Sequence, residues 1–255
     1  MPFELITIPC LSDNYAFLLR DGESGAVAVI DVPQAAPIKA ELAARGWTVS
    51  QIWLTHHHDD HVMGLDALLA DFPAPVYGAR ADAHRLPKLD HQLADGDKFE
   101  LGALEVDVLD VSGHTIGHIA FHVPGAHAAF TADSLMALGC GRLFEGKPAQ
   151  MWESLQKLMA LPANTQICSG HEYTASNANF ALTVDPDNPE LMSRCRAIAD
   201  ARKNGVPTVP SLLSLELQTN PFLRPADTGI RAHLGLQNAT DAEVFAEIRA
   251  RKDNF

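Results

Sequence analysis

The residues best suited to chemistry lie in one short segment, the letters HHHDDH at residues 56–61. Within it, His56, His58, Asp60 and His61 form the pattern H-x-H-x-D-H. Imidazole nitrogens and a carboxylate are donors that suit zinc, iron or manganese. Directly after a strand, His56 and His58 can face one way, while Asp60 and His61 turn toward a neighbouring position. The segment therefore predicts a metal site.

A polar loop whose histidines are only solvated is the alternative interpretation of this segment. The regular alternation of ligand types argues against it, because solvated loops rarely show that pattern. At the two intervening positions, by contrast, the interpretation without metal binding is the stronger one. We expect His57 and Asp59 to face solvent or to support the ligands rather than to bind metal.

Three further segments each offer one ligand-type side chain near the end of an expected strand. His114 lies in GHTIGH, Asp133 in TADS and His171 in SGHEY. Each signal alone is weak, since a lone histidine or aspartate there usually serves a turn. Together they supply one ligand per loop at one edge of a sheet, where rigid scaffolds carry their sites. Seven such residues are more than one tetrahedral site needs, which indicates two metal ions per chain. Other histidines near strands, His118, His122 and His127, are set aside.

Short strands and helices must position these residues. Apolar runs and alternation predict strands at residues 3–8, 14–20, 26–31, 52–55, 104–108, 119–123 and 128–131. A helix is expected from Pro37 to Arg45, closed by Gly46, and another along the apolar face from Met151 to Met159.

The character of the sequence changes after about residue 173. Asn188 and Pro189 suit the cap and first position of a helix. Thr240 and Glu243 form a capping-box pattern before another apolar face. The sequence therefore predicts an α/β domain that binds metal over residues 1–173, followed by a helical domain over residues 174–255.

Composition narrows the class of partner. The 255 residues are 47% hydrophobic and 20% charged, with a formal net charge of -13. Such acidity argues against nucleic acid and anionic membranes as partners. No apolar run is long enough to span a bilayer, and the N-terminus lacks a secretory pattern. The four scattered cysteines are typical of reduced thiols. We expect a cytoplasmic monomer that acts on a small molecule.

The motifs HHHDDH, GHTIGH, FTADSL and SGHEYT, in this order, resemble those of the metallo-β-lactamase superfamily. The closer likeness is to the hydroxyacylglutathione hydrolase (glyoxalase II) family. It is carried by GCGRLFEG at residues 139–146, SGHEYTASNANFA at 169–181, TNPFLR at 219–224 and RARKDNF at 249–255. The likeness includes the helical tail, which the wider superfamily lacks. It implies an αββα sandwich with the site at one edge, followed by a small helical domain.

The resemblance also implies a ligand set for two divalent metal ions, zinc first, with iron or manganese as alternatives. One ion would be held by His56, His58 and His114. The other would be held by Asp60, His61 and His171, with Asp133 bridging both. The matching positions for glutathione are Arg142, Phe144, Tyr173, Arg249 and Lys252. Two positions depart from the family pattern: Phe144 replaces a tyrosine, and Met63-Gly64 replaces a glycine pair.

The basic residues near the C-terminus have a simpler explanation, because the helix dipole alone favours positive charge there. The local excess of positive charge in so acidic a chain nevertheless suits glutathione, which carries two carboxylates. On the helical period Arg249 and Lys252 share a face, while Arg251 points elsewhere.

The implied reaction is hydrolysis of S-(2-hydroxyacyl)glutathione thioesters, such as S-D-lactoylglutathione, to D-lactate and glutathione, a step in methylglyoxal detoxification. Two metal ions can share one water and lower its pKa. Asp133 is suited to bridge them, and Asp60 could orient the water. The leaving thiol, with a pKa of about 8.5, departs with little help from an acid.

Three alternatives stay open at this point. The first is another metallohydrolase, acting on a lactone, a β-lactam or a phosphodiester. The second is a mononuclear iron dioxygenase acting on glutathione persulfide, which lacks so long a helical tail. The third is a catalytically silent binding protein, which would be expected to have lost a ligand. There is no G-x-S-x-G motif to indicate a serine nucleophile.

Overall fold

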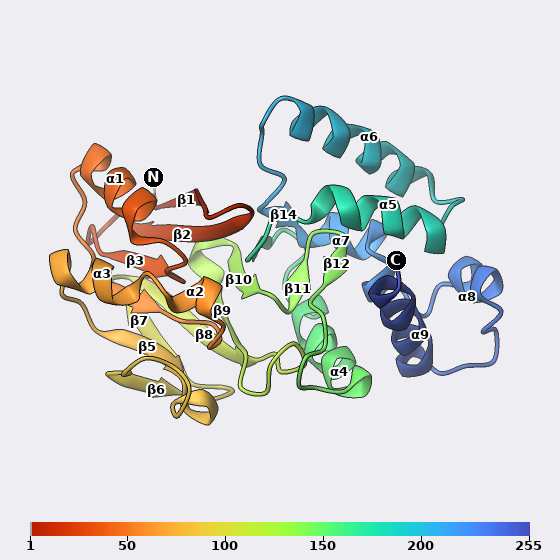
Figure 1. Ribbon diagram of the computed structural model, residues 1–255, viewed down its shortest axis with the longest axis horizontal. Helices are drawn as coiled ribbons and strands as arrows, with labels where there is room; N and C mark the ends of the chain where they lie inside the picture. The colour runs from red at the N-terminus through yellow and green to blue at the C-terminus, as the bar shows by residue number, and fades with distance from the viewer. Residues whose placement is uncertain (1) are drawn as a thin grey trace. The chain divides into compact units, whose positions relative to one another are not determined.

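The computed structural model describes residues 2–255 and divides into two compact units. The first unit runs to Val111 and resumes over Ile116–Ala132, and the second comprises Ser112–Thr115 and Asp133–Phe255. Figure 1 shows the elements of each unit along the chain. Among the described residues, no helix combines the length and the apolar character needed to cross a membrane.

A six-stranded sheet forms one layer of the first unit. Its strand order is β1-β2-β3-β4-β5-β6. The first three strands are antiparallel neighbours, and the last three continue in parallel. The strands are β1 (Phe3–Cys10), β2 (Asn14–Asp21), β3 (Val27–Ile30), β4 (Gln51–Trp53), β5 (Val76–Ala79) and β6 (His91–Leu93).

Four antiparallel strands form the second layer of this unit, in the order β10-β9-β8-β7. They are β7 (Lys98–Leu101), β8 (Leu104–Asp110), β9 (Ile119–Val123) and β10 (Ala128–Ala132). Aromatic side chains fill the space between the layers. The Trp53 ring lies 5.3 Å from that of Phe121, and the Phe17 ring lies 5.7 Å from that of Phe130. The core of this unit therefore lies between its two sheets.

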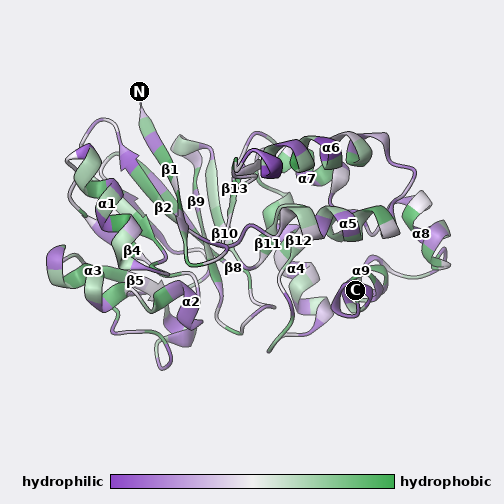
Figure 2. Cartoon of the chain, turned by 45° about the horizontal axis from the view of Figure 1, so that its top comes forward, coloured by the Kyte–Doolittle hydropathy of each residue, from purple (hydrophilic) through white to green (hydrophobic). Residues whose placement is uncertain are grey.

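Short helices connect the strands of the first sheet. They are α1 (Ala35–Arg45), α2 (Asp59–Val62), α3 (Leu65–Asp71) and the 3-10 turn η1 (Arg80–Asp82); η2 (Pro124–Ala126) joins β9 to β10. Figure 2 shows α1 and α3 on one side of the first sheet, with β8, β9 and β10 on the other. Gly46 ends α1 in the left-handed region, as its position in the sequence predicts.

The second unit is mostly helical. Its strands form two short antiparallel pairs, β11 (Leu135–Met136) with β12 (Gly139–Cys140), and β13 (Gln166–Ser169) with β14 (Ser211–Leu212). Its helices are α4 (Pro148–Met159), α5 (Thr174–Val184), α6 (Pro189–Lys203), α7 (Leu213–Thr219), the 3-10 turn η3 (Pro221–Leu223), α8 (Thr228–Leu234) and α9 (Asp241–Asp253).

The predicted helix caps are confirmed in the second unit. The Asn188 side chain accepts from the backbone N–H of Leu191, and Thr240 forms a capping box with Glu243. Helix α6 buries Leu191 and Ile198 in an apolar cluster whose other buried members are Leu138, Ala178 and Ala181. This cluster packs the turn of the β11–β12 hairpin against α5 and α6.

Candidate active site

The metal motif follows β4 directly. His56 is buried and His58 half-buried, and His56 Nε2 lies 3.2 Å from His58 Nδ1. Two imidazole nitrogens that bind the same tetrahedral zinc ion at 2.0–2.1 Å would lie about 3.3 Å apart. The spacing therefore fits two nitrogens directed at a shared cation.

Asp31 orients two of the predicted ligand histidines, and sequence reasoning missed it. Its buried carboxylate lies at the end of β3, where Oδ2 is 2.8 Å from His61 Nδ1 and accepts from Thr55 Oγ1 at 2.8 Å. Thr55 Oγ1 is in turn 3.0 Å from His56 Nδ1. Asp31, His56 and His61 are themselves close enough to hold a metal. Thr55 and His61 already occupy both carboxylate oxygens of Asp31, so we interpret Asp31 as a support rather than a ligand. It engages Nδ1 of His61 directly and Nδ1 of His56 through Thr55, so that Nε2 of each ring is the atom that could bind a metal.

Asn14 holds Asp60 from the start of β2. Its Nδ2 donates to the Asp60 carbonyl and to Asp60 Oδ2, both at 3.0 Å. Asp60 Oδ2 lies 3.9 Å from His61 Nε2. The two neighbours in sequence therefore present an oxygen and a nitrogen near one another, as the motif predicts.

His57 points to a different partner from its neighbours. Its Nδ1 lies 2.8 Å from Asp82 Oδ2, and Arg85 Nε donates to the other Asp82 oxygen at 2.6 Å. Arg85 Nη2 also donates to the carbonyl of Ile116. His57 thus ties the metal motif to the start of the segment that leads into β9. Asp59 is exposed at the start of α2.

His118, which the sequence analysis set aside, is fully buried against the metal motif. Its ring stacks on that of His56, with centroids 4.6 Å apart and planes 13° from parallel. It limits how the His56 ring can tilt. Its place in GHTIGH, four residues after His114, was the available signal.

The second unit brings the other three predicted ligands together. Asp133 Oδ2 lies 3.5 Å from His114 Nε2 and 3.2 Å from His171 Nε2, and all three side chains are buried. His114 Nδ1 lies 2.7 Å from the carbonyl oxygen of Arg142, which leaves Nε2 facing Asp133. A carboxylate placed between two imidazoles suits a bridging ligand.

Gly141 closes this cluster because no side chain fits there. A Cβ at this position would lie 1.8 Å from the carbonyl oxygen of Asp133 and 3.0 Å from His114 Nδ1. The chain after β12 therefore passes directly against two of the predicted ligands.

Two exposed aromatic residues cover the histidines of this cluster. The Tyr173 ring stacks on that of His171, with centroids 4.6 Å apart, and the Phe144 ring meets that of His114 edge-on at 5.3 Å. Phe144 is 63% exposed and Tyr173 41%. Arg142 is also exposed, and its Nε lies 3.4 Å from Asp253 Oδ1. Each of these three predicted substrate residues lies beside the ligand cluster or in the chain segment that leads from it.

Arg249 and Lys252 differ in exposure. Arg249 is only 6% exposed, and its guanidinium donates to the Cys140 carbonyl at 2.8 Å and to Asp253 at 2.9 Å. The half-buried Lys252 ammonium lies over the rings of Phe180 and Phe255. Burial, and secondly the charge of Arg249, lowers the pKa of Lys252. Lys252 therefore keeps contact with solvent, whereas Arg249 is committed to protein groups.

The departure at Met63-Gly64 leaves the ligands in place. Met63 ends α2 with an exposed side chain. Gly64 has no room for a Cβ, which would lie 2.8 Å from the backbone of Val32 and of Ala35. The second glycine position is thus the one that the packing requires.

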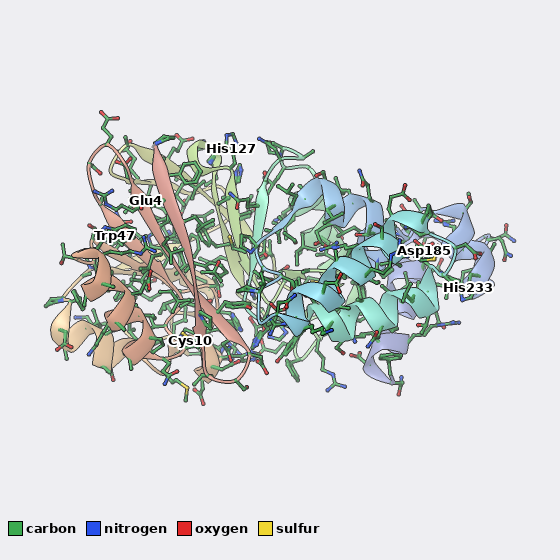
Figure 3. The ribbon with its side chains drawn as sticks, turned by 90° about the horizontal axis from the view of Figure 1, so that it is seen from above. Glu4, Cys10, Trp47, His127, Asp185 and His233 are labelled. Carbon is green, nitrogen blue, oxygen red and sulfur yellow. The ribbon has the colours of Figure 1, made fainter. Side chains whose placement is uncertain are left out.

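The four cysteines are all free thiols, of which only Cys195 is half-buried rather than buried. Burial raises the pKa of Cys10 and of Cys140 to about 11, and raises the pKa of Cys168 further. Figure 3 shows Cys10 in the first unit. Protonated, enclosed thiols are poor nucleophiles, so hydrolysis has no cysteine suited to attack.

Comparison with known sequences divides the chain into two matched regions. Residues 12–171 match the metallo-beta-lactamase superfamily, and residues 172–255 match the family described as hydroxyacylglutathione hydrolase C-terminus. Two relatives named hydroxyacylglutathione hydrolase, from Ruegeria pomeroyi and Roseobacter denitrificans, are 64% and 63% identical over 255 residues, the full length of both chains in each case.

Solved structures share the fold. ETHE1 from Myxococcus xanthus aligns with a TM-score of 0.67 at 22% identity, over 98% of this chain and 90% of that one. TTHA1623, solved in a di-iron-bound form, aligns with a TM-score of 0.63 at 25% identity, over 86% of this chain and all of that one. The sandwich and the helical tail expected from the sequence are confirmed.

Proposed function

Because the chain belongs to the hydroxyacylglutathione hydrolase family of the metallo-β-lactamase superfamily, we propose that it hydrolyses S-(2-hydroxyacyl)glutathione thioesters such as S-D-lactoylglutathione. The products are D-lactate and glutathione, which makes the chain a thioester hydrolase of methylglyoxal detoxification. The single observation that carries the proposal is the Asp133 cluster, in which both imidazoles are covered by exposed aromatic rings.

The metal assignment is part of this proposal and rests on the family pattern. His56, His58 and His114 would hold one divalent ion, and Asp60, His61 and His171 the other, with Asp133 shared. Within each unit the donors support it, since Nδ1 of His56, His61 and His114 is already engaged by another group and Nε2 is the donor toward the proposed metal. Such donors suit zinc, and iron or manganese equally fit them.

When bound, the metal ions would supply activation of water and polarisation of the thioester carbonyl. The chain's own residues do the rest. Asp60 would orient the attacking water, and its contacts with Asn14 support this by fixing the carboxylate. The thiol of glutathione has a pKa of about 8.5, so it leaves as a thiolate without a dedicated acid.

Glutathione recognition is assigned to Arg142, Phe144, Tyr173 and Lys252. The exposed rings offer apolar surface beside the ligands, and the two cations offer charge for the carboxylates of the substrate. Phe144 lacks the phenolic hydroxyl of a tyrosine and cannot donate a hydrogen bond. Arg249, the fifth predicted residue, would act on substrate through the Cys140 carbonyl that it holds.

We also propose that residues 1–173 form the metal-binding domain and that the helical domain over residues 174–255 contributes to glutathione binding. The boundary between the two matched regions, at 171 and 172, supports this division. We propose further that the protein is a monomer and acts in the cytoplasm.

The deciding experiment compares three substrate classes on one preparation of known metal content. We expect kcat/KM for S-D-lactoylglutathione to exceed that for a lactone or a β-lactam by at least about 100-fold, since a site built for polar substrate groups rejects analogues that lack them. Comparable values for all three would remove the assignment. Oxygen uptake with glutathione persulfide, in place of thioester cleavage, would favour a dioxygenase instead.

A further inference from the structure

The β11–β12 hairpin is held by buried side chains from the helical part of the second unit. Asn220 Nδ2 donates to the carbonyls of Met136 and Gly139, at 3.2 and 3.1 Å. Glu216 Oε2 accepts from the backbone N–H of Leu138 at 2.9 Å. Two further carbonyls of the hairpin accept from Asn177 and from Arg249. Side chains from distant helices thus fix a segment of only a few residues.

Both ends of this hairpin lie at the ligand cluster. Asp133 precedes it, and after it the Gly141 N–H donates to the Ser134 carbonyl at 3.1 Å. The next carbonyl, that of Arg142, lies 2.7 Å from His114 Nδ1. A displacement of the hairpin would therefore move Asp133 and release the His114 ring from its orientation.

Glu216 is the charged centre of this arrangement. Its carboxylate is fully buried. Oε2 accepts hydrogen bonds from Leu138 N and Asn220 Nδ2. Oε1 accepts from Ser211 Oγ at 2.6 Å and pairs with Arg194 Nη2. Apolar residues generally stabilise a fold as well as a buried ion pair does, so such a pair is weak evidence for stability alone. Leu138, which Glu216 holds, has a φ of 55°, a conformation that a leucine keeps only when its surroundings enforce it.

We propose that Glu216, fixed by Arg194, is a positioning residue for Asp133 and His114. It sets the hairpin in one place, and the hairpin sets the shared carboxylate and the histidine ring. The inference rests on the proposed function for the identity of the metal ligands. It assigns to the helical part a second task besides substrate recognition, which is to determine how firmly metal is held.

Glu216→Gln tests this with little change in shape. In either orientation of the amide, its NH2 faces donors: Leu138 N and Asn220 on one side, or Arg194 on the other. The matched control is Asp185→Asn. Asp185, labelled in Figure 3, is also buried. It pairs with an arginine, Arg224, and accepts a hydrogen bond from the side chain of Asn188. These contacts join the ends of helical segments and include no group of the hairpin, so the loss of Asp185 should lower stability without moving the hairpin.

Three quantities are measured on each metal-loaded protein: metal retained against a chelator, the melting temperature, and kcat with KM for S-D-lactoylglutathione. For Glu216→Gln we expect metal affinity and kcat each to fall by about 10-fold or more, the range found when groups that orient ligands are removed. Asp185→Asn should melt earlier and keep both. A folded Glu216→Gln protein with parental metal affinity and kcat would overturn the inference.

Ser211→Ala is a milder variant in case Glu216→Gln does not fold. It removes one donor to Glu216 Oε1 and should shift metal retention in the same direction by a few-fold; no shift would contradict the inference. The chelator measurement also separates the two proposals. A parent that holds metal but does not cleave the thioester would contradict the proposed function alone, whereas unchanged retention in the variants contradicts the role of Glu216.

Discussion

At the scale of single residues, the geometry of the site depends on which group contacts Nδ1 of each histidine ring. His61 uses Nδ1 on Asp31, His56 uses Nδ1 on Thr55, and His114 uses Nδ1 on a backbone carbonyl. In each case this contact restrains the ring and leaves Nε2 as the donor that the proposed metal site would use. Removing a group of this kind typically lowers metal affinity or activity by about 10- to 100-fold.

Asp31→Asn should weaken metal binding by about 10- to 100-fold, because an amide can present a donor where His61 and Thr55 require an acceptor. Chelator competition on the loaded protein measures the change. Asp21→Asn is the control, since Asp21 is equally buried in the same unit but binds a turn away from the histidines. Unchanged retention in Asp31→Asn would show that the ring of His61 is held by other contacts.

Asp133→Ala should lose most of the activity and much of the metal, since one carboxylate is shared by His114 and His171. We expect kcat/KM to fall by at least about 100-fold, with elemental analysis showing less than two metal equivalents per chain. If a preparation with one equivalent turned over at the full rate, the two-metal mechanism would be wrong.

The sequence singles out the proposed ligands but not the groups that support them. Four of the seven proposed ligands lie within six residues, so their spacing is itself a signal. Asp31 lies 30 residues from His61, Asn14 lies 46 from Asp60, and Glu216 lies 78 from Leu138. Only the fold brings such pairs together, and a single carboxylate at a strand end has many ordinary uses.

At the scale of elements, prediction succeeded where a pattern was local. Leu104, Val106 and Val108 alternate with polar residues, and β8 buries the apolar three as expected. Strand β6 (His91–Leu93) has no such alternation, because two of its three residues are exposed. Strand β6 forms because it pairs with the edge of β5, and only the tertiary fold brings the two segments together.

The carboxylate of Asp21 stabilises the turn between β2 and β3. Asp21 accepts from Glu23 N, from Ser24 N and Oγ, and from Ala103 N, so it joins this turn to the one between β7 and β8. The Ser24 hydroxyl, followed by the Ala103 N–H, lowers the pKa of Asp21 well below its usual range. The folded protein therefore favours the ionised form more strongly than the unfolded chain does.

Asp21→Asn should lower stability at neutral pH, and the deficit should shrink in acid. The contribution of a carboxyl group with a lowered native pKa is complete above its unfolded pKa of about 3.9 and is lost as the pH falls toward the native value. Urea midpoints measured from pH 7 down to the acid limit would show this convergence. A deficit that stayed constant with pH would mean that the asparagine fails for reasons of shape rather than charge. Activity per folded chain should not change.

At the scale of the whole molecule, charge opposes the proposed substrate. The chain has a net charge of -13, and glutathione carries two carboxylates against one ammonium. Long-range repulsion must then be offset by local cations at the site. Lys252 is the half-buried candidate near the C-terminus, whereas Arg251 is exposed and pairs with Glu247.

Lys252→Ala should raise KM by roughly tenfold and leave kcat nearly intact, the result expected when binding is lost equally from substrate and transition state. Added salt should raise KM in the parent more than in the variant, since screening acts on the contact that the variant lacks. Arg251→Ala is the matched control and should change neither quantity. A Lys252→Ala protein with the parental KM and salt response would leave this lysine as a residue that only finishes a helix.

The buried cysteines have a consequence for a protein that works with glutathione. Thiol–disulfide exchange requires a thiolate, and a thiol with a pKa of about 11 is ionised at pH 7 in only about one molecule in ten thousand. Oxidised glutathione near the folded chain would thus find Cys10 and Cys140 both enclosed and protonated. Cys168 is more strongly affected, and burial raises the pKa of Cys195 as well. The fold therefore keeps its three buried cysteines out of the redox chemistry of the thiol that it releases.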